Sequence, residues 1–187
     1  IAKGDGPYII DVNGKRYIDA ISSWWVNLHG HGHPYMAKRI YEQALELEQV
    51  IFAGFTHEPA VRLAEKLLNL LQGPYEKIFY SDNGSTSTEV AVKMAIQYWW
   101  NKGDRSRTKI LALKNGYHGD TFGAMSVSDR SVFTLAFQDR LFEVQFIDPP
   151  SDSNLNSILG DIDPDRTACF IYEPLLQGAG GMNMYEA

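Results

Sequence analysis

The stretch Lys77–Trp100, KIFYSDNGSTSTEVAVKMAIQYWW, carries the clearest fold signal in the sequence. Its β-prone run Ile78–Tyr80 leads straight into the turn-forming residues Asp82–Gly84. From Ser85 or Thr86 onward, apolar residues recur at the spacing of one helical face. The stretch therefore predicts a strand, a tight polar loop and an amphipathic helix in immediate succession.

The start of this helix suits a bound anion. A first helical turn offers unpaired backbone N–H groups at the positive end of the helix dipole. Gly84 lets an anion approach closely, and Ser85, Thr86, Ser87 and Thr88 supply hydroxyl groups. Thr86 and Glu89 also have the spacing of a capping box, so a helix cap without any ligand is the alternative interpretation. Neither the GxxxxGK[ST] nor the GxGxxG pattern of nucleotide-binding loops is present.

Composition limits the classes of protein and partner. With 187 residues and 44% apolar content, the chain is long and apolar enough to form a soluble globular body. The formal charge of −6 predicts no nucleic-acid partner, and neither that charge nor the absence of a long apolar run favours a membrane. The single Cys169, within an apolar run, predicts a buried thiol in a reducing cytoplasm. The start at Ile1 indicates that residues upstream are missing.

The N-terminal part begins with a hairpin signal. Asn13–Gly14 separates the runs Tyr8–Val12 and Lys15–Asp19, which predicts a two-stranded ribbon. A tryptophan pair at Ser22–Trp25 and the loop His29–Pro34, HGHGHP, follow. Alternating histidines raise a metal hypothesis, but no Cys or carboxylate stands close by in sequence to complete a site. We expect a packed polar loop and no metal.

The rest of the chain alternates helical and strand patterns. Helices are predicted over Pro34 to about Glu48, Glu58–Leu71, Thr121–Val127 and Asn154–Leu159, and strands over Lys109–Leu113, Glu143–Ile147 and Thr167–Tyr172. The helix between Ile78–Tyr80 and Lys109–Leu113 fits a βαβ crossover and a parallel pair of strands. This order predicts an α/β fold.

Three loops should meet at one edge of the sheet, because ligands of open α/β sheets bind beyond the carboxyl ends of the strands. They are Asp82–Ser87, Asn115–Asp120 and Glu173–Gly181. Together they offer a phosphate cup, an aromatic residue beside a histidine, and a carboxylate, which are the groups that a phosphorylated aromatic cofactor requires. Taken singly, Tyr117 also fits a surface tyrosine and Glu173 a solvated strand end.

Four motifs in order carry a family resemblance: SSWW at Ser22–Trp25, DNGS…EVAVKMA at Asp82–Ala95, GYHGDT at Gly116–Thr121 and EPLLQGAGGM at Glu173–Met182. With them the chain resembles, over nearly its whole length, the class III, fold type I aminotransferases that use pyridoxal 5′-phosphate. The resemblance implies an N-terminal hairpin segment followed by the first part of a mainly parallel sheet with helices on both faces. It assigns residues 1–50 to a small-domain or interface part, and residues 51–187 to a truncated cofactor-binding large domain.

The resemblance also implies roles for single residues. Gly84 and Ser85 match residues that hold the cofactor phosphate, although Asn83 stands where the family commonly has serine. Tyr117 matches the aromatic residue that stacks on the pyridine ring, with His118 beside it. The remaining matches are Glu173, near the pyridine-nitrogen site, Asp120, an acidic residue of the substrate site, and Trp24 with Trp25, the wall of the substrate pocket.

Within the family, Asp120 and the tryptophan pair favour the branch that acts in biotin synthesis. That branch implies S-adenosylmethionine as amino donor, 8-amino-7-oxononanoate as acceptor, and a cytoplasmic homodimer. Three alternatives stay open at this point: another class III ω-aminotransferase of the ornithine or 4-aminobutyrate type, a non-catalytic phosphate- or nucleotide-binding module, and a purely structural fragment.

The catalytic lysine of the family lies downstream of the EPLLQGAGGM motif, as does the aspartate that pairs with the pyridine nitrogen. Lys93 and Lys114 do not occupy the position of that lysine. We therefore expect no catalytic residue within these 187 residues and no transamination by them alone.

Overall fold

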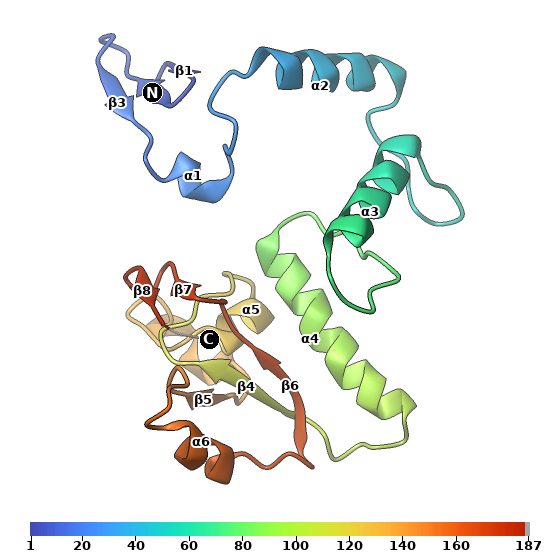
Figure 1. The fold of residues 1–187 in the computed structure, drawn as a ribbon, viewed down its shortest axis with the longest axis vertical. Coiled ribbons are helices and arrows are strands. Elements are labelled where there is room, and N and C mark those ends of the chain that lie inside the picture. The colour runs from blue at the N-terminus through green and yellow to red at the C-terminus, as the bar shows by residue number, and fades with distance from the viewer. Residues whose placement is uncertain (186–187) are drawn as a thin grey trace. The chain divides into compact units, whose positions relative to one another are not determined.

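The computed structural model describes residues 1–185, and the chain divides into two compact units. The first unit comprises Ile1–Ile78, and the second begins at Phe79. Figure 1 shows the elements of both, and each unit is described by itself below. The assignment of residues 1–50 and 51–187 to family domains stays a prediction.

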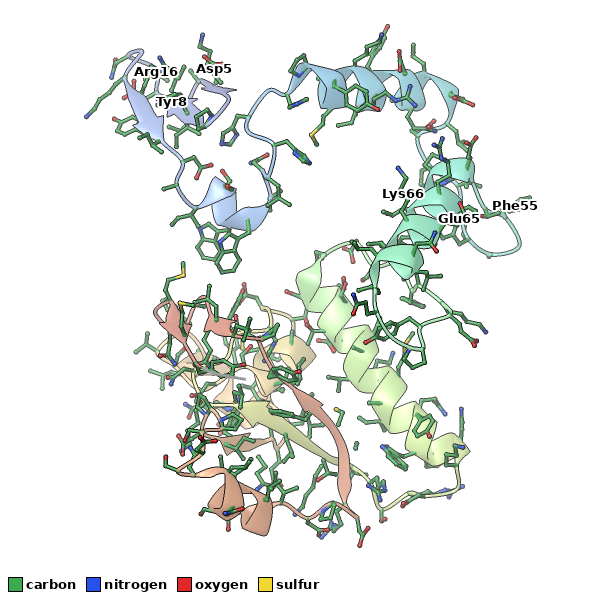
Figure 2. The ribbon with its side chains drawn as sticks, in the orientation of Figure 1. Asp5, Tyr8, Arg16, Phe55, Glu65 and Lys66 are labelled. Atoms are coloured by element: carbon green, nitrogen blue, oxygen red, sulfur yellow. The ribbon has the colours of Figure 1, made fainter. Side chains whose placement is uncertain are left out.

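The first unit opens with a small antiparallel sheet. Its strands are β1 (Lys3–Asp5), β2 (Tyr8–Ile10) and β3 (Arg16–Ile18), in the order β1-β2-β3. The predicted hairpin is confirmed: Tyr8 pairs with Ile18, and Gly14 takes the positive φ of 84° that its turn requires. The Arg16 guanidinium lies 3.9 Å from the centre of the Tyr8 ring, a cation–π contact across the two strands (Figure 2). Strand β1 was not predicted.

Three helical segments complete this unit: α1 (Ser22–Trp25), α2 (Pro34–Glu46) and α3 (Glu58–Leu70). Pro34 occupies the first turn of α2, where its missing N–H costs nothing. The His57 side chain caps α3 by accepting the Ala60 N–H at 3.2 Å. Both long helices begin where the sequence predicts, and neither contains a buried residue.

The second unit is organised on a parallel sheet. Its strands are β4 (Lys109–Leu113), β5 (Gln145–Ile147) and β6 (Thr167–Ile171), in the order β5-β4-β6, with a separate antiparallel ribbon of β7 (Leu176–Gln177) and β8 (Asn183–Met184). The central strand β4 is the most buried element, and its residues Ile110–Leu113 are at most 4% exposed. A run that is apolar on both faces is typical of a parallel strand covered on both sides.

The helices of the second unit are α4 (Gly84–Asn101), α5 (Phe122–Val127) and α6 (Leu155–Asp161), with a 3₁₀ helix η1 (Leu135–Arg140). Helix α4 contacts both β6 and α5 (Figure 1). One cluster of the core consists of Val92, Ile110 and Val127, and Val144, Cys169 and Ile171 pack against it. Cys169 is half-buried rather than fully buried, and this burial raises the pKa of its thiol.

One predicted element is wrong. Ile78–Tyr80 is not a strand, and the parallel partners of β4 are β5 and β6 instead. A strand is defined by pairing with a neighbour, and the sheets of residues 1–185 offer this run no ladder. The Phe79 side chain is accordingly 64% exposed. Local β propensity alone therefore predicted a strand here that does not form.

Across the described range, no helix is long and apolar enough to cross a membrane.

Candidate active site

The start of α4 differs from the predicted cap. Asn83 is the N-cap residue: its side chain accepts the Thr86 N–H at 3.0 Å, and its own N–H donates to Thr86 Oγ1 at 3.3 Å. The capping box is therefore Asn83 with Thr86, and the predicted pair of Thr86 with Glu89 is wrong. The reason is that the helix begins at Gly84, so Thr86 is the third helical residue rather than the cap.

This cap leaves part of the helix terminus free. It satisfies the N–H of Thr86, whereas the N–H groups of Gly84 and Ser85 have no acceptor within residues 1–185. A Cβ added at Gly84 would meet no atom within 4 Å, so open space adjoins this residue. Two free donors at the positive end of an 18-residue helix form a suitable anion site. Asp82 lies beside them, and a hydrogen bond from the Thr86 hydroxyl lowers the pKa of its carboxyl group.

Ser85 joins α4 to the loop after β4. Its Oγ accepts the Asp120 N–H at 3.1 Å, which leaves the hydroxyl hydrogen available to a ligand oxygen. The approach is close because Gly119 has no side chain: a Cβ there would lie 2.2 Å from Ser85 Oγ and 2.7 Å from Ser85 Cα. Gly119 also has a φ of 131°, which disfavours any other residue. Gly119 is thus a site-forming residue that the sequence analysis missed.

Two further side chains of α4 fix the same loop. The Thr88 hydroxyl donates to the His118 carbonyl at 3.0 Å. The Glu89 carboxylate accepts the N–H of Gly123 at 2.6 Å and of Ala124 at 3.3 Å, so it caps α5. Burial raises the pKa of Glu89, but hydrogen bonds from the start of α5 lower it more, and the net shift is downward from 4.5. Glu89 therefore acts as a long-range cap.

Tyr117, Asp120 and Glu173 are brought together at the carboxyl edge of the sheet. The Tyr117 hydroxyl donates to Asp120 Oδ2 at 2.9 Å, and the Tyr117 N–H lies 3.5 Å from Glu173 Oε2. Burial, together with the Asp120 carboxylate, raises the pKa of Tyr117, while burial raises the pKa of Glu173. The expected convergence of the loops after β4 and β6 with the start of α4 is therefore observed in the structure.

His118 takes no part in the hydrogen bonds that join Tyr117, Asp120 and Glu173. Its N–H donates to Ser128 Oγ at 2.8 Å, and that hydroxyl donates in turn to the Ala124 carbonyl. The ring Nε2 is buried and has no hydrogen-bond partner within residues 1–185. Burial lowers the pKa of His118, which favours the neutral imidazole. Its predicted role beside a cofactor stays a prediction.

The loop after β6 is held by a buried glutamine. Gln177 is 0% exposed; its side-chain amide donates to the Lys114 carbonyl at 2.6 Å and accepts from the Asn183 side chain at 3.0 Å. Gly180 allows this packing, because a Cβ there would lie 2.5 Å from the Asn115 carbonyl oxygen. The glutamine fixes the EPLLQGAGGM segment to the end of β4, and no pattern in the sequence signals this role.

Lys114 and Lys93 lie at two different places in this unit. Lys114 Nζ pairs with Asp148 Oδ2 at 3.0 Å, and Lys93 is an exposed residue of α4. Trp24 and Trp25 belong to the first unit, where they are 77% and 53% exposed. His31 of the histidine loop forms an ion pair with Asp19 at 2.7 Å. Within the described sequence, no group of three or more His, Cys, Asp or Glu residues could hold a metal ion.

This edge of the second unit thus combines a helix terminus that has free donors within residues 1–185, a hydroxyl beside it, an aromatic residue and a half-buried carboxyl group, which are groups that suit a phosphorylated aromatic ligand. The family model of class III aminotransferases matches residues 1–187, and the chain belongs to this family. The fold is accordingly that of the fold type I aminotransferases, as expected from the sequence.

Several members of this family are similar to the chain in sequence or in structure. Adenosylmethionine-8-amino-7-oxononanoate aminotransferase of Synechococcus elongatus is 46% identical over 98% of this chain and 46% of its own length. The crystal structure of the enzyme of that name from Methanocaldococcus jannaschii superposes with a TM-score of 0.93 at 38% identity, over 99% of this chain and 43% of that one. A PLP-bound amine transaminase from an uncultivated Pseudomonas species gives a TM-score of 0.88 at 32% identity, over 97% of this chain and 45% of that one. The chain thus spans about half the length of the relatives that it matches.

Proposed function

We propose that this chain forms part of a pyridoxal-phosphate-dependent aminotransferase that converts 8-amino-7-oxononanoate to 7,8-diaminononanoate, with S-adenosylmethionine as amino donor. The observation that supports the class is the hydrogen bond from Asp120 N–H to Ser85 Oγ, which brings the free start of α4 to the loop of Tyr117. The substrates rest on the similarity to relatives that carry the name of this enzyme.

The residues of the second unit fit pyridoxal phosphate. The Gly84 and Ser85 N–H groups, with the Ser85 hydroxyl, are three donors without an acceptor in the described structure, and a phosphate dianion requires such donors. Tyr117 is 38% exposed, so its ring is accessible to a planar ligand. A half-buried Glu173 carboxyl group lies at the same edge, in contact with Tyr117.

These contacts suggest a division of roles. Gly84 and Ser85 would hold the phosphate, and Tyr117 would orient the ring, because its hydroxyl is fixed by Asp120. His118 would support the loop through its backbone hydrogen bonds, and Glu173 would provide a carboxyl group near the pyridine nitrogen. When bound, the cofactor would supply an electron sink and would carry the amino group from the donor to the acceptor. Trp24 and Trp25 would offer apolar surface to the long-chain acceptor.

A half-reaction tests this function. The full-length polypeptide that contains this chain is loaded with pyridoxal phosphate and mixed with S-adenosylmethionine alone, and the cofactor absorbance is followed. Acceptor is then added, and 7,8-diaminononanoate is measured by mass spectrometry. The proposal predicts conversion of the cofactor by the donor and formation of the diamine.

The same assay separates the alternatives. Conversion by ornithine, 4-aminobutyrate or a simple amine, but not by S-adenosylmethionine, would support another class III ω-aminotransferase, an activity suggested by the likeness to a solved amine transaminase. Binding of a nucleotide without binding of pyridoxal phosphate would support a phosphate-binding module instead. Location in the cytoplasm and assembly as a homodimer belong to the proposal, and they rest on the family resemblance.

A further inference from the structure

The segment that carries the two tryptophans has an unusual backbone. Ser22, Ser23, Trp24 and Trp25 have φ values of 51°, 48°, 62° and 67°, so four successive non-glycine residues follow a left-handed turn. Left-handed helical geometry costs L-residues roughly 1–2 kcal/mol each. Such a backbone persists only where its surroundings determine it, and it is found mainly at functional sites.

Asp19 provides the contacts that determine this turn. Its Oδ1 accepts the Ser23 N–H at 3.0 Å, and its Oδ2 accepts the Ser23 hydroxyl at 2.7 Å. Hydrogen bonds from Ser23 and from His31 lower the pKa of Asp19 to about 2, so the carboxylate is charged at neutral pH. Backbone bonds add to this hold: Ser22 N–H donates to the Asp19 carbonyl at 3.2 Å, and Trp25 N–H to the Ile21 carbonyl at 2.8 Å.

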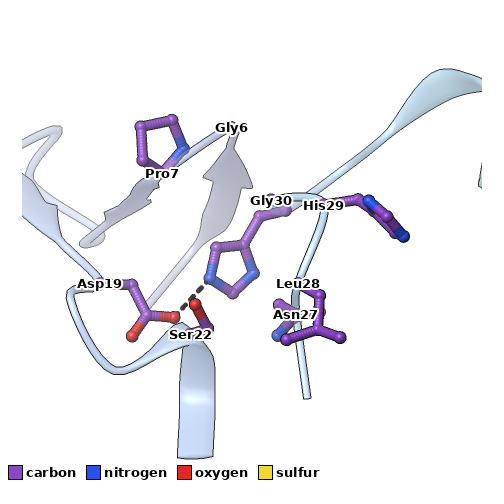
Figure 3. Close-up of a pocket in the computed structure, with 9 residues that line it drawn as sticks. Gly6, Pro7, Asp19, Ser22, Asn27, Leu28, His29 and Gly30 are labelled. Atoms are coloured by element: carbon purple, nitrogen blue, oxygen red, sulfur yellow. Dashed lines mark hydrogen bonds and ion pairs between the residues drawn. The ribbon is translucent and has the colours of Figure 1, made fainter. Parts of the chain in front are cut away.

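His31 connects Asp19 to the sheet. Its Nε2 lies 2.7 Å from Asp19 Oδ2, and because a carboxylate only accepts, Nε2 carries the hydrogen (Figure 3). The His31 backbone exchanges two hydrogen bonds with Gly6, of 2.8 and 3.0 Å. The ring passes close over Gly4, where a Cβ would lie 2.3 Å from His31 Cβ. The Asp19 and His31 side chains are only 11% and 17% exposed, so solvent competes weakly for their contact.

The tryptophans are held without being buried. Trp24 is 77% exposed and Trp25 is 53% exposed, although the turn beneath them is fixed by shielded groups. Core packing therefore does not explain the turn. A rigid backbone under two exposed indoles is instead suited to present apolar surface to a ligand in a fixed direction.

We propose that Asp19 and His31 are positioning residues, which hold the left-handed turn of Ser22–Trp25 so that both indoles stand ready for the aliphatic chain of the acceptor. The turn contributes apolar contact along that chain and takes no part in the transfer of the amino group. This inference rests on the proposed function for its substrate. The clamp itself, by which we mean Asp19 and His31 with their contacts to Ser22–Trp25, is a property of the first unit alone.

The test uses the full-length polypeptide with Asp19→Asn, His31→Ala and His31→Gln. The Asp19→Asn side chain keeps one acceptor oxygen and loses the second, His31→Ala removes the donor, and His31→Gln restores an N–H donor near Asp19. Asp11→Asn is the matched control, because Asp11 accepts the N–H groups of Asn13 and Lys15 at 2.9 and 3.0 Å in the same unit without touching Ser22–Trp25. Near-UV circular dichroism without substrate reports all four tryptophans of this chain, so the spectra of Trp24→Ala and Trp25→Ala define the part of the signal that comes from the turn. Steady-state kinetics report the acceptor KM and kcat.

Asp19→Asn and His31→Ala should reduce the tryptophan dichroism and raise the acceptor KM about tenfold, with kcat changed by less than about twofold. His31→Gln should recover most of both signals, and Asp11→Asn should match the wild type. Unchanged dichroism and KM in Asp19→Asn and His31→Ala would overturn the inference. If Asp19→Asn does not fold, His31→Ala and His31→Gln carry the test.

Two more variants separate the inference from the proposed function. If Trp24→Ala and Trp25→Ala raise the acceptor KM but the clamp variants do not, the inference fails and the function stands. If the tryptophan variants leave KM unchanged, the substrate part of the inference fails together with the proposed role of the indoles. If a different acceptor is used by the enzyme, the dichroism still decides whether Asp19 and His31 hold the turn.

Discussion

Positive φ values are required both in the phosphate cup, which comprises Gly84, Ser85 and Gly119 at the start of α4 and in the loop that contacts it, and in the left-handed turn of Ser22–Trp25. Different residue types adopt them in the two places. In the cup, Gly119 has a φ of 131° and also allows Ser85 to approach. In the turn, two serines and two tryptophans adopt positive φ, and the Asp19 carboxylate holds them there. The cup is thus unstrained but intolerant of added volume, whereas the turn is strained and depends on its neighbours. Substitutions at these two places should therefore differ in sign as well as in size.

The largest effect is expected for Gly119→Ala. The new Cβ would lie 2.2 Å from Ser85 Oγ on a backbone that already disfavours it. We expect a loss of about 3–5 kcal/mol in the free energy of unfolding of the full-length polypeptide, together with loss of pyridoxal phosphate binding. Gly103→Ala is the control: its φ is 82°, but its Cβ would meet no atom within 4 Å, so it should cost about 1 kcal/mol. Equal denaturation midpoints for the two variants would contradict the close approach.

Ser85→Ala should weaken binding rather than folding. It removes a hydroxyl that accepts from Asp120 N–H and is free to donate to a phosphate oxygen. A hydrogen bond to a charged group contributes about 1.5–3 kcal/mol, so the Kd of pyridoxal phosphate should rise roughly 10- to 100-fold. Ser87→Ala serves as the control, because the Ser87 hydroxyl donates to the Asn83 carbonyl at 2.8 Å. Titration by absorbance should leave the Ser87 variant within about twofold of the wild type.

Glu89→Gln tests how α5 is fixed to α4. The charged carboxylate caps α5, and its pKa is lowered from 4.5, so its stabilising effect is complete above pH 4.5 and is lost as the pH falls below that value. The variant should lose about 1 kcal/mol of unfolding free energy at pH 7, and this difference should shrink below pH 4.5. Urea denaturation from pH 7 to pH 4 measures it. Glu65→Gln, at an exposed position of α3, is the control; a pH-independent difference for Glu89→Gln would refute the charge-dependent cap.

The smallest effect, with opposite sign, is expected for Ser22→Gly. Only the backbone of Ser22 forms hydrogen bonds in the described structure, so the substitution removes strain and no side-chain bond. It should stabilise the protein by up to about 1 kcal/mol, whereas Ser22→Ala, which keeps the Cβ, should be neutral. Thermal unfolding compares the two variants. A destabilised Ser22→Gly would mean that the left-handed turn is not strained.

Local signals predicted much of this molecule. The hairpin at Asn13–Gly14, the start of α2 at Pro34 and the three strands of the parallel sheet follow from turn residues and hydrophobic periodicity. The loops after β4 and β6 meet as topology requires, so the proximity of Tyr117 and Glu173 was predictable from the sequence.

What the sequence did not predict depends on contacts between distant residues. Glu89 has the spacing of a local cap, yet it caps a helix 34 residues away. The Asp19–His31 pair spans 12 residues and has no motif of its own. Serine and tryptophan are poor candidates for positive φ, so the left-handed turn had no local signal. Ile78–Tyr80 shows the reverse error, because this β-prone run is not part of any sheet within residues 1–185.

A structure of the full-length polypeptide with bound pyridoxal phosphate would show where the phosphate is held. Phosphate oxygens are expected at hydrogen-bond distance, about 3 Å, from the N–H groups of Gly84 and Ser85 and from Ser85 Oγ, with the ring beside Tyr117. A phosphate held elsewhere, with the start of α4 still unligated, would contradict the assignment of the cup and with it the function proposed from its geometry.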